Sequence, residues 1–469
     1  MGQILRRIDM TTKYRGILEW VKQQIEDEQL NTGDKLPSIR RLSEQFKCSK
    51  NTVVKALLEL EQQHIVYAKP KSGYYVVDHY QTPSPQENDI DFLSAGPDKR
   101  IMPYKDFQHC MNQAIEHYKE QLFTYGEQQG LLTLRKELAK YLQHLQVFTK
   151  PERLVITSGS QQALHILSII PFPNGKKNVL IEQPTYFGMI DTLELNQIPT
   201  LGIELTMKGI DFERLENLFK NNDIKFFYIV PRFHNPLGHF YNNEEKKKIV
   251  ALAEKYDVYI VEDDFLAELD TDLKADPLFA YEPNGRVIYV KSFSKVFLPG
   301  LRIATVVLPE EMIPTFVNYK FSTDFISSPL SQGALEIYLK NGMFQYHLES
   351  VKKLYLKKMK SLVEACSRYL PNYVQFTNPK SGFYLTIFLP SHLDVNKLIY
   401  LLNEKHIYVD NASRMYLAEN KQKAIRLSIS QVNEDKINLG IQQLATYIIA
   451  LYEKKKYNLL SFKTYHKSK

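Results

Sequence analysis

The chain has 469 residues, a length that suggests about three domains, and its composition, 44% hydrophobic and 24% charged, is typical of a globular protein. The net charge of +7 does not by itself indicate nucleic-acid binding, and the three dispersed cysteines exclude a cysteine metal site and favour a reducing, cytoplasmic setting. The N-terminus lacks the apolar core of a signal peptide, and no uncharged apolar run is long enough to span a bilayer.

The first 78 residues are predicted to form a small domain of three helices and a two-stranded hairpin. Apolar residues recur at helical spacing in the first two helices. The third helix is expected over 50–62, with Ser49 as its N-cap, and the strands over 65–68 and 74–77. This order of elements predicts a winged helix-turn-helix domain.

Basic and polar side chains gather where such a domain meets double-stranded DNA. The N-terminal end of a recognition helix reads base edges, and basic residues around it hold phosphates. The predicted DNA-contacting residues are Arg40, Arg41, Ser49, Lys50, Asn51, Thr52, Lys55, Lys69 and Lys71, with Thr52 and Lys55 on the outer face of the third helix. The alternative is a helical protein-binding module with a solvated charged face, because residues 29–77 hold only eight Lys/Arg against four Asp/Glu.

After residue 78 the sequence pattern changes from that of a small helical domain to a linker and then a larger α/β region. Residues 79–91 are polar, contain two prolines and are predicted to be a linker. Over 92–452 continuous apolar strands alternate with helices, which predicts an α/β domain with a mainly parallel sheet covered on both faces. A basic tail completes the chain over 453–469.

Polar residues just past these strands are expected to converge at one edge of the sheet, where α/β proteins bind ligands. The set suits pyridoxal 5'-phosphate (PLP), which requires a lysine for a Schiff base, partners for its ring and a phosphate cradle. We expect Lys295 to bond PLP, Asp263 to pair with its ring nitrogen, Asn235 with its ring hydroxyl, and Tyr186 to stack on the ring. The expected phosphate cradle comprises Ser158, Gly159, Ser160, Gln161, Ser292, Ser294 and Arg302.

Each of these residues taken singly has an ordinary interpretation, as a surface lysine, a helix cap or a core tyrosine, and only their joint occurrence indicates a site. The motifs "SFSKVFLPGLR", "HNPLG" and "EQPTYFG" resemble those of the fold-type I aminotransferases. The resemblance implies that Tyr125 reaches the cofactor phosphate of a dimer partner and that Arg426 binds a substrate carboxylate. The alternative for Arg426 is an exposed strand edge. Gly96 is expected to approach the ligand by its backbone.

Residues 33–77 resemble the GntR-type winged helix, and its fusion to an aminotransferase-like domain resembles the MocR subfamily of bacterial transcriptional regulators. The resemblance implies a homodimer that binds operator DNA and senses an amine, an amino acid or PLP itself. The alternative is an active PLP-dependent aminotransferase with an appended DNA-binding module. A DNA-binding protein with an empty, degenerate second domain is a third possibility.

One position departs from the aminotransferase pattern. Relatives commonly place a tyrosine two residues after Asp263, where it reaches the cofactor's ring hydroxyl, and this chain has Phe265. Because Asn235 is retained, we expect this hydroxyl to be contacted from one side only. That change should shift the pH at which bound PLP changes colour, and it favours sensing over turnover.

Overall fold

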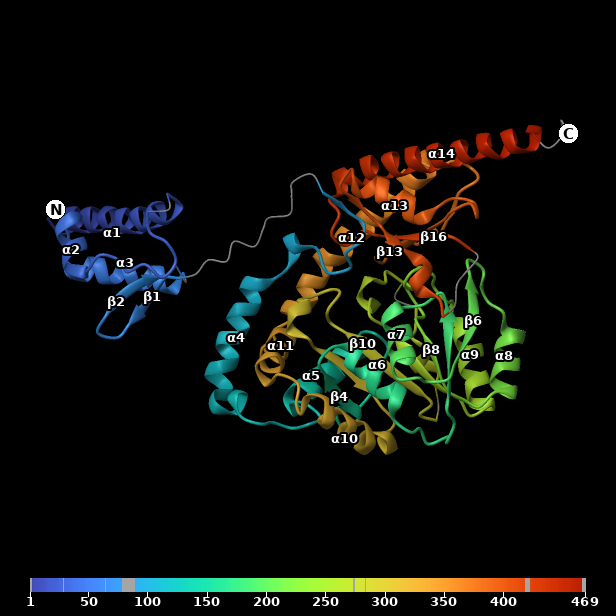
Figure 1. Cartoon of the computed structure of the whole chain (residues 1–469). Coiled ribbons are helices and arrows are strands. Elements are labelled where there is room, and N and C mark those ends of the chain that lie inside the picture. The colour runs from blue at the N-terminus through green and yellow to red at the C-terminus, as the bar shows by residue number, and fades with distance from the viewer. Residues whose placement is uncertain are drawn as a thin grey trace. The chain divides into compact units, whose positions relative to one another are not determined.

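The computed structural model describes residues 2–27, 29–63, 65–77, 89–272, 275–282, 284–417 and 422–465. The chain divides into two compact units, Met1–Glu87 and Asn88–Lys469, whose elements are labelled in Figure 1. Most of the expected linker, residues 79–88, and the last four residues of the expected tail lie outside the described residues.

The first unit has the expected order of helices and strands. Leu42, Val53 and Leu60 are fully buried in its core, and Trp20 packs edge-on against Phe46 with ring centroids 5.9 Å apart. Its elements are α1 (Gly2–Glu26), α2 (Ile39–Gln45), α3 (Lys50–Gln62) and the antiparallel strands β1 (Val66–Lys69) and β2 (Gly73–Val76). The winged helix-turn-helix prediction is therefore confirmed.

The second unit is built on an eight-stranded sheet with the strand order β4-β11-β10-β9-β8-β5-β6-β7. The five central strands run parallel to one another, while β11 is antiparallel to both of its neighbours and β7 to β6. The strands are β4 (Leu154–Thr157), β5 (Asn178–Gln183), β6 (Thr200–Thr206), β7 (Gly209–Ile210), β8 (Ile224–Ile229), β9 (Tyr259–Asp263), β10 (Val287–Ser292) and β11 (Ala304–Val307). The predicted mainly parallel sheet is thus confirmed.

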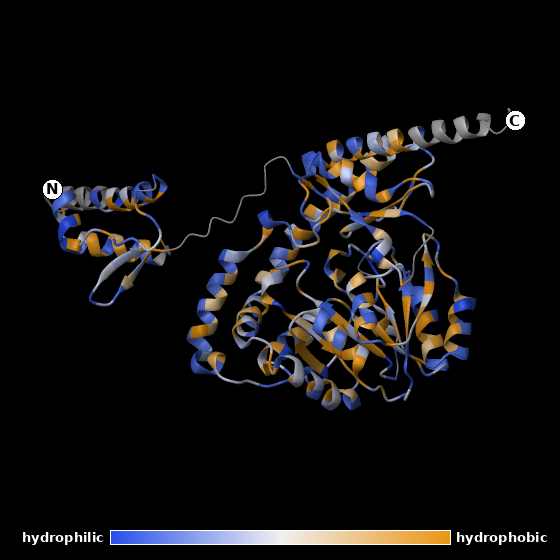
Figure 2. Cartoon of the chain, in the orientation of Figure 1, coloured by the Kyte–Doolittle hydropathy of each residue, from blue (hydrophilic) through white to orange (hydrophobic). Residues whose placement is uncertain are grey.

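Helices surround this sheet and bury its strands. Helix α6 packs on β4, β10 and β11, whereas α9 packs on β9. Figure 2 shows hydrophobic residues concentrated on the central strands. The helices are α4 (Tyr104–Tyr118), α5 (Leu132–Gln143), α6 (Ser160–Ile169), α7 (Phe187–Leu195), α8 (Phe212–Asn221), α9 (Asn243–Lys255), α10 (Ile313–Asp324) and α11 (Pro329–Lys340). Among the described residues, no helix has the length and apolar character that crossing a membrane requires.

A smaller sheet, of order β12-β13-β16-β15, lies beside α12, α13 and α14 in Figure 1. Strand β14 pairs separately with β3 in parallel. The bounds are β3 (Ile90–Asp91), α12 (Met343–Tyr369), β12 (Gln375–Phe376), β13 (Tyr384–Phe388), α13 (Val395–Asn403), β14 (Ile407–Tyr408), β15 (Asp410–Asn411), β16 (Ala424–Ser428) and α14 (Glu434–Tyr465). Helix α14 therefore continues into the segment that we expected to be a separate tail.

The stability of the first unit can be measured alone, because Trp20 is the only tryptophan in the sequence. Leu60 is fully buried, so Leu60→Ala should lower the free energy of unfolding of this unit by about 3 kcal/mol. Urea unfolding followed by Trp20 fluorescence measures the change. Leu58 lies on the same helix with 45% of its surface exposed, and Leu58→Ala is the matched control. Equal losses in the two variants would contradict the assigned core.

Candidate cofactor site and DNA-binding surface

A cavity of about 500 Å³ opens beside the carboxyl ends of the central strands. Four predicted site residues line it together: Tyr186 after β5, Asn235 after β8, Lys295 after β10 and Arg426 on β16. The other lining residues are Leu93, Ala95, Phe187, Tyr384, Asp410, Asn411, Ser413 and Arg414. The large and small sheets of the second unit thus both contribute to one cavity.

Lys295 presents an amine of lowered basicity to this cavity. Its Nζ donates a hydrogen bond to the carbonyl oxygen of Ala95 at 2.9 Å. Burial above all, together with the positive charges of Arg426 and Arg302 and against the opposing effect of Asp263, lowers the pKa of Lys295 to about 8. An amine with this pKa is neutral, and hence nucleophilic, in a much larger fraction of molecules at neutral pH than an ordinary lysine.

Asp263, the last residue of β9, has one carboxylate oxygen without a partner. Its Oδ2 accepts a hydrogen bond from the Tyr228 hydroxyl at 2.8 Å, but Oδ1 is buried and has no hydrogen-bond partner among the described residues. Burial raises the pKa of Asp263 to about 6, so the group is still ionised at neutral pH. A buried, unpaired carboxylate oxygen fits a ligand that brings a cationic N–H donor, as the ring nitrogen of PLP does.

Asn235 has its amide orientation fixed by Arg426. Arg426 Nη1 donates to Asn235 Oδ1 at 3.1 Å, and because a guanidinium has only donors, the amide oxygen must face it. The two Nδ2 protons of Asn235 are left for another acceptor. This arrangement suits donation to a ring hydroxyl oxygen.

Tyr186 is held by Gln161 through a short chain of hydrogen bonds. The Tyr186 hydroxyl donates to Gln161 Oε1 at 3.1 Å, while Gln161 Nε2 donates to the Gly188 carbonyl and to Thr192 Oγ1 at 2.8 and 2.7 Å. Burial raises the pKa of Tyr186 to about 12, so its phenol stays protonated. The side chain of Gln161 therefore orients the predicted stacking ring.

The predicted phosphate cradle surrounds the start of α6. Gly159 has φ of +88°, and a Cβ there would lie 2.4 Å from Arg302 Nη2, so this glycine admits the guanidinium. Ser158 is already engaged, since its hydroxyl donates to Asp324 at 2.6 Å and its amide to Gln162 at 2.8 Å. The amides of Ser160 and Gln161 lie in the first turn of α6, where they have no intrahelical acceptor and can bind an anion.

Ser292 and Ser294 shape the turn that leads to Lys295. Ser292 is 3% exposed, and its Oγ accepts a hydrogen bond from the Ser294 amide at 3.2 Å. This contact holds the chain where it leaves β10. A phosphate contact by either hydroxyl stays a prediction.

Tyr125 and Gly96 do not line the cavity, and neither do Asp263 and the residues of the predicted phosphate cradle. Tyr125 is 84% exposed, and its ring lies against Phe325 with centroids 5.0 Å apart. The Gly96 carbonyl accepts a hydrogen bond from Gln431 at 3.2 Å, and its neighbours Leu93 and Ala95 line the cavity instead.

Asp410 and Arg414 were missed by the sequence analysis although they lie beside Arg426. Asp410 accepts from Arg426 Nη2 at 2.7 Å and from Arg414 Nη2 at 3.0 Å. Arg426 is 3% exposed, which rules out the exposed strand edge, and its Nε has no partner among the described residues. Asp410 precedes Arg414 by four residues, but no periodic pattern in the loop indicated that both would reach the cavity.

The predicted DNA-binding residues lie largely on exposed surface. Lys50, Asn51 and Lys55 are exposed on α3, and Arg40, Arg41, Lys69 and Lys71 are exposed around it. Ser49 is confirmed as the N-cap, since its Oγ accepts from the Thr52 amide. The placement of Thr52 on the outer face is wrong. Thr52 is 2% exposed and its Oγ1 bonds to Ser49 Oγ at 2.9 Å, because the cap folds both side chains together.

Comparisons with known proteins match both units. Residues 13–76 match the bacterial regulatory proteins of the gntR family, and residues 101–444 match aminotransferase class I and II. The uncharacterised HTH-type transcriptional regulator YcxD of Bacillus subtilis is 41% identical over 93% of this chain and 100% of its own length. The regulator NorG of Staphylococcus aureus is 25% identical over 88% of this chain and 99% of its own.

Solved aminotransferases share the fold of the second unit. Kynurenine aminotransferase of Pyrococcus horikoshii, whose structure contains pyridoxamine phosphate (PMP), aligns with a TM-score of 0.73 and 28% identity over 78% of this chain and 92% of its own. LysN of Thermus thermophilus aligns with a TM-score of 0.72 and 26% identity over 78% and 94%. Together with the regulators, these matches show that the chain belongs to the HTH-type transcriptional regulators that fuse a GntR-type winged helix to an aminotransferase class I and II domain, the MocR architecture.

Proposed function

We propose that this protein is a homodimeric transcriptional regulator whose aminotransferase-like unit binds PLP at Lys295 and senses an amine, an amino acid or PLP itself. The observation that carries the proposal is the presence of two groups in one unit, the Lys295 amine lining the cavity and the buried Asp263 oxygen that has no partner among the described residues, in a chain that also exposes a recognition helix. The first feature fits PLP and the second fits operator DNA.

Each residue of the proposed site contacts a different part of PLP. Lys295 supplies the amine, Asp263 the acceptor for the ring nitrogen, Asn235 a donor to the ring oxygen, and Tyr186 a flat face. Arg302 and the first-turn amides of α6 supply positive charge for the phosphate. Bound PLP contributes an electrophilic carbon that bonds reversibly to amines and a chromophore that absorbs visible light.

Arg426 is the proposed contact for an effector carboxylate. Its guanidinium suits bidentate binding of a carboxylate, but Asp410 already takes one of its nitrogens at 2.7 Å. An effector carboxylate must therefore share Arg426 with Asp410 or displace it, and Arg414 then becomes available as a second cation. Binding changes operator affinity only if the effector has different affinities for the two states of the protein.

Exposed aromatic side chains support the proposed homodimer. Phe123, Tyr125, Phe321 and Phe325 are 66%, 84%, 37% and 44% exposed. Phe325 also contacts both Tyr125 and Phe321, with centroids 5.0 and 4.2 Å apart. A group of exposed rings is typical of an interface. A second copy covering it would allow Tyr125 to reach the partner's cofactor phosphate.

Active transamination is the second candidate, and the Lys295, Asp263 and Asn235 set favours it, because the solved relatives with this fold are aminotransferases. A steady-state assay with amino acids and keto acids separates the two functions. Turnover at about 1 s⁻¹ or faster would favour the enzyme. A change in operator affinity on adding amines, without turnover, is the result expected for a regulator.

Gly159→Ala should weaken PLP binding about tenfold or more, because the new Cβ meets Arg302 and only glycine adopts this backbone conformation without strain. Titration of the protein with PLP, followed by visible absorbance, measures the affinity. Gly300→Ala is the matched control, since a Cβ at Gly300 has no atom within 4 Å. If both variants bind PLP as the wild type does, the phosphate cradle is elsewhere.

Two variants of the first unit should affect DNA binding differently. Asn51 is exposed at the N-terminal end of α3, where it is placed to read a base edge. Asn51→Ala should therefore weaken binding to duplexes that carry the preferred base pair at one position by about 1–3 kcal/mol, and the variant should discriminate less between bases at that position. Lys69→Ala should weaken binding to all duplexes by the same factor. It should also reduce the slope of log affinity against log salt concentration by about one. Fluorescence anisotropy with duplexes selected by the wild type from a random pool measures both effects. If Asn51→Ala loses the same affinity for every duplex, Asn51 contacts only the DNA backbone.

A further inference from the structure

Tyr384 places a buried phenol in the cofactor cavity, where no role has been assigned to it. The residue is 1% exposed and lines the same cavity as Lys295, Asn235 and Arg426. Among the described residues no group makes a hydrogen bond with its hydroxyl. The hydroxyl is not one of the fully enclosed polar atoms that lack a partner, so it is open to the cavity, where a ligand atom can bond to it.

The register of the small sheet fixes Tyr384 beside Asn235. On β13, Tyr384 lies two residues before Thr386, so both side chains share one face, and Thr386 Oγ1 donates to the Pro236 carbonyl at 2.9 Å. The turn after Asn235 packs directly on β13, since a Cβ on Gly238 would lie 2.6 Å from the Tyr384 carbonyl oxygen. The phenol therefore stands next to the residue predicted to contact the ring hydroxyl.

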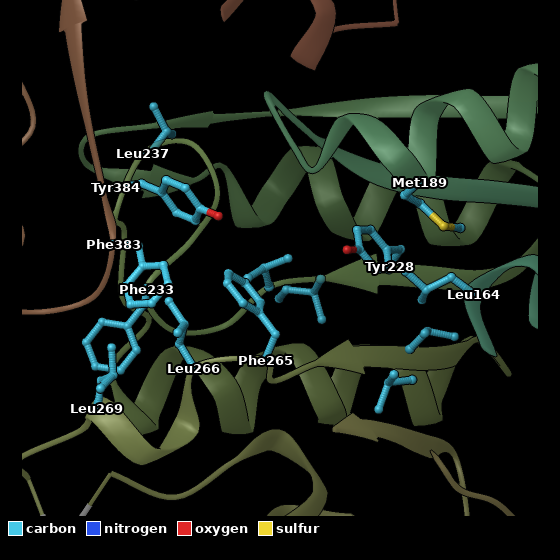
Figure 3. Packing of buried hydrophobic residues seen from close by; sticks show 14 of the residues in the cluster. Leu164, Met189, Tyr228, Phe233, Leu237, Phe265, Leu266, Leu269, Phe383 and Tyr384 are labelled. Atoms are coloured by element: carbon cyan, nitrogen blue, oxygen red, sulfur yellow. The ribbon is translucent and has the colours of Figure 1, made fainter. Parts of the chain in front are cut away.

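The ring of Tyr384 also neighbours Phe265, with centroids 6.3 Å apart. In Figure 3 the hydroxyls of Tyr384 and Tyr228 point toward each other across the view, and the Phe265 side chain lies between these two residues. Tyr228 is the donor to Asp263, the expected partner of the ring nitrogen. A phenol that is absent at position 265 is thus present at Tyr384 on β13 of the small sheet.

Charged groups surround the Tyr384 phenol on several elements. Arg426 on β16 lies over its ring at 4.8 Å and lowers the pKa of the phenol, while the charges of Asp410 on β15 and Asp263 on β9 raise it. Lys295 lines the cavity from the loop after β10. Burial raises the pKa of Tyr384, so the hydroxyl is a proton donor throughout the neutral range.

We propose that the Tyr384 hydroxyl donates a hydrogen bond to the ring oxygen of bound PLP and takes the place of the phenol that Phe265 lacks. This inference rests on the proposed binding of PLP at Lys295. It replaces the expectation of a one-sided contact by one in which Asn235 and Tyr384 both donate to the ring oxygen.

The consequence concerns the proton that the Lys295 nitrogen shares with that ring oxygen. Negative charge on the oxygen raises the pKa of this proton. Each hydrogen bond donated to the oxygen delocalises the charge and lowers that pKa. Tyr384 therefore lowers the pH at which the proton leaves and the visible band changes.

Tyr384→Phe, which removes only the hydroxyl, should raise the pH midpoint of the visible band by about one unit. Spectrophotometric titration of the PLP-loaded, full-length protein measures the midpoint. Tyr338→Phe is the control: Tyr338 is also 1% exposed but packs among Phe297 and Phe344 and does not line this cavity. Its midpoint should equal that of the wild type.

The double variant Tyr384→Phe/Phe265→Tyr tests whether the two phenols are exchangeable. Phe265→Tyr alone should lower the midpoint, because it adds a donor, and in the double variant it should return the midpoint toward the wild-type value. A purely structural role of Tyr384 would give no such rescue.

The possible failures are distinguishable. A wild type that stays colourless with added PLP would overturn the proposed function, and this inference with it. A coloured wild type whose midpoint is unchanged in Tyr384→Phe would overturn only the contact to the ring oxygen. If that variant instead loses affinity for amino acids at an unchanged midpoint, the phenol binds the effector, and the inference is wrong.

Discussion

An ionised carboxylate with an unpaired oxygen, inside a protein, is the constraint on which the cofactor site depends. Asp263 ends a central strand of the parallel sheet, where burial raises its pKa to about 6 and only one oxygen has a partner. Leaving such a group unpaired costs about 1–3 kcal/mol or more. A ligand with a protonated ring nitrogen would remove this cost, and the free energy gained would contribute to binding.

Arg426 connects Asn235 to the acidic and basic groups on the other side of the cavity, where we propose that an effector binds. One of its nitrogens fixes the Asn235 amide and another pairs with Asp410, which also holds Arg414. A carboxylate that draws Arg426 away from Asp410 therefore acts on Asn235 as well, and through it on the ring oxygen. The same contacts tie the small sheet to the loop after β8. In the proposed function, movement of the small sheet carries the effect of the ligand to the rest of the protein, because ligands bias equilibria between such packed arrangements.

The sequence predicted the elements and the ends of the strands better than it predicted side-chain partners. Alternating apolar strands and helices indicated the parallel sheet, and the rule that ligands bind at its carboxyl edge gathered Tyr186, Asn235 and Lys295 correctly in one cavity. Thr52 was misplaced because its helical position predicted exposure, while its hydroxyl folds back onto the N-cap. Asp410, Arg414 and Tyr384 come from the small sheet and its loops, whose approach to the large sheet no local pattern reveals.

The most direct test of the central claim is the operator affinity of the wild type and of Lys295→Ala, each with and without PLP, measured by fluorescence anisotropy. The account predicts that PLP changes the affinity of the wild type and leaves that of the variant unchanged, because only Lys295 bonds the cofactor. Equal affinities of the wild type with and without PLP, at concentrations where its visible band shows the site to be filled, would contradict the account.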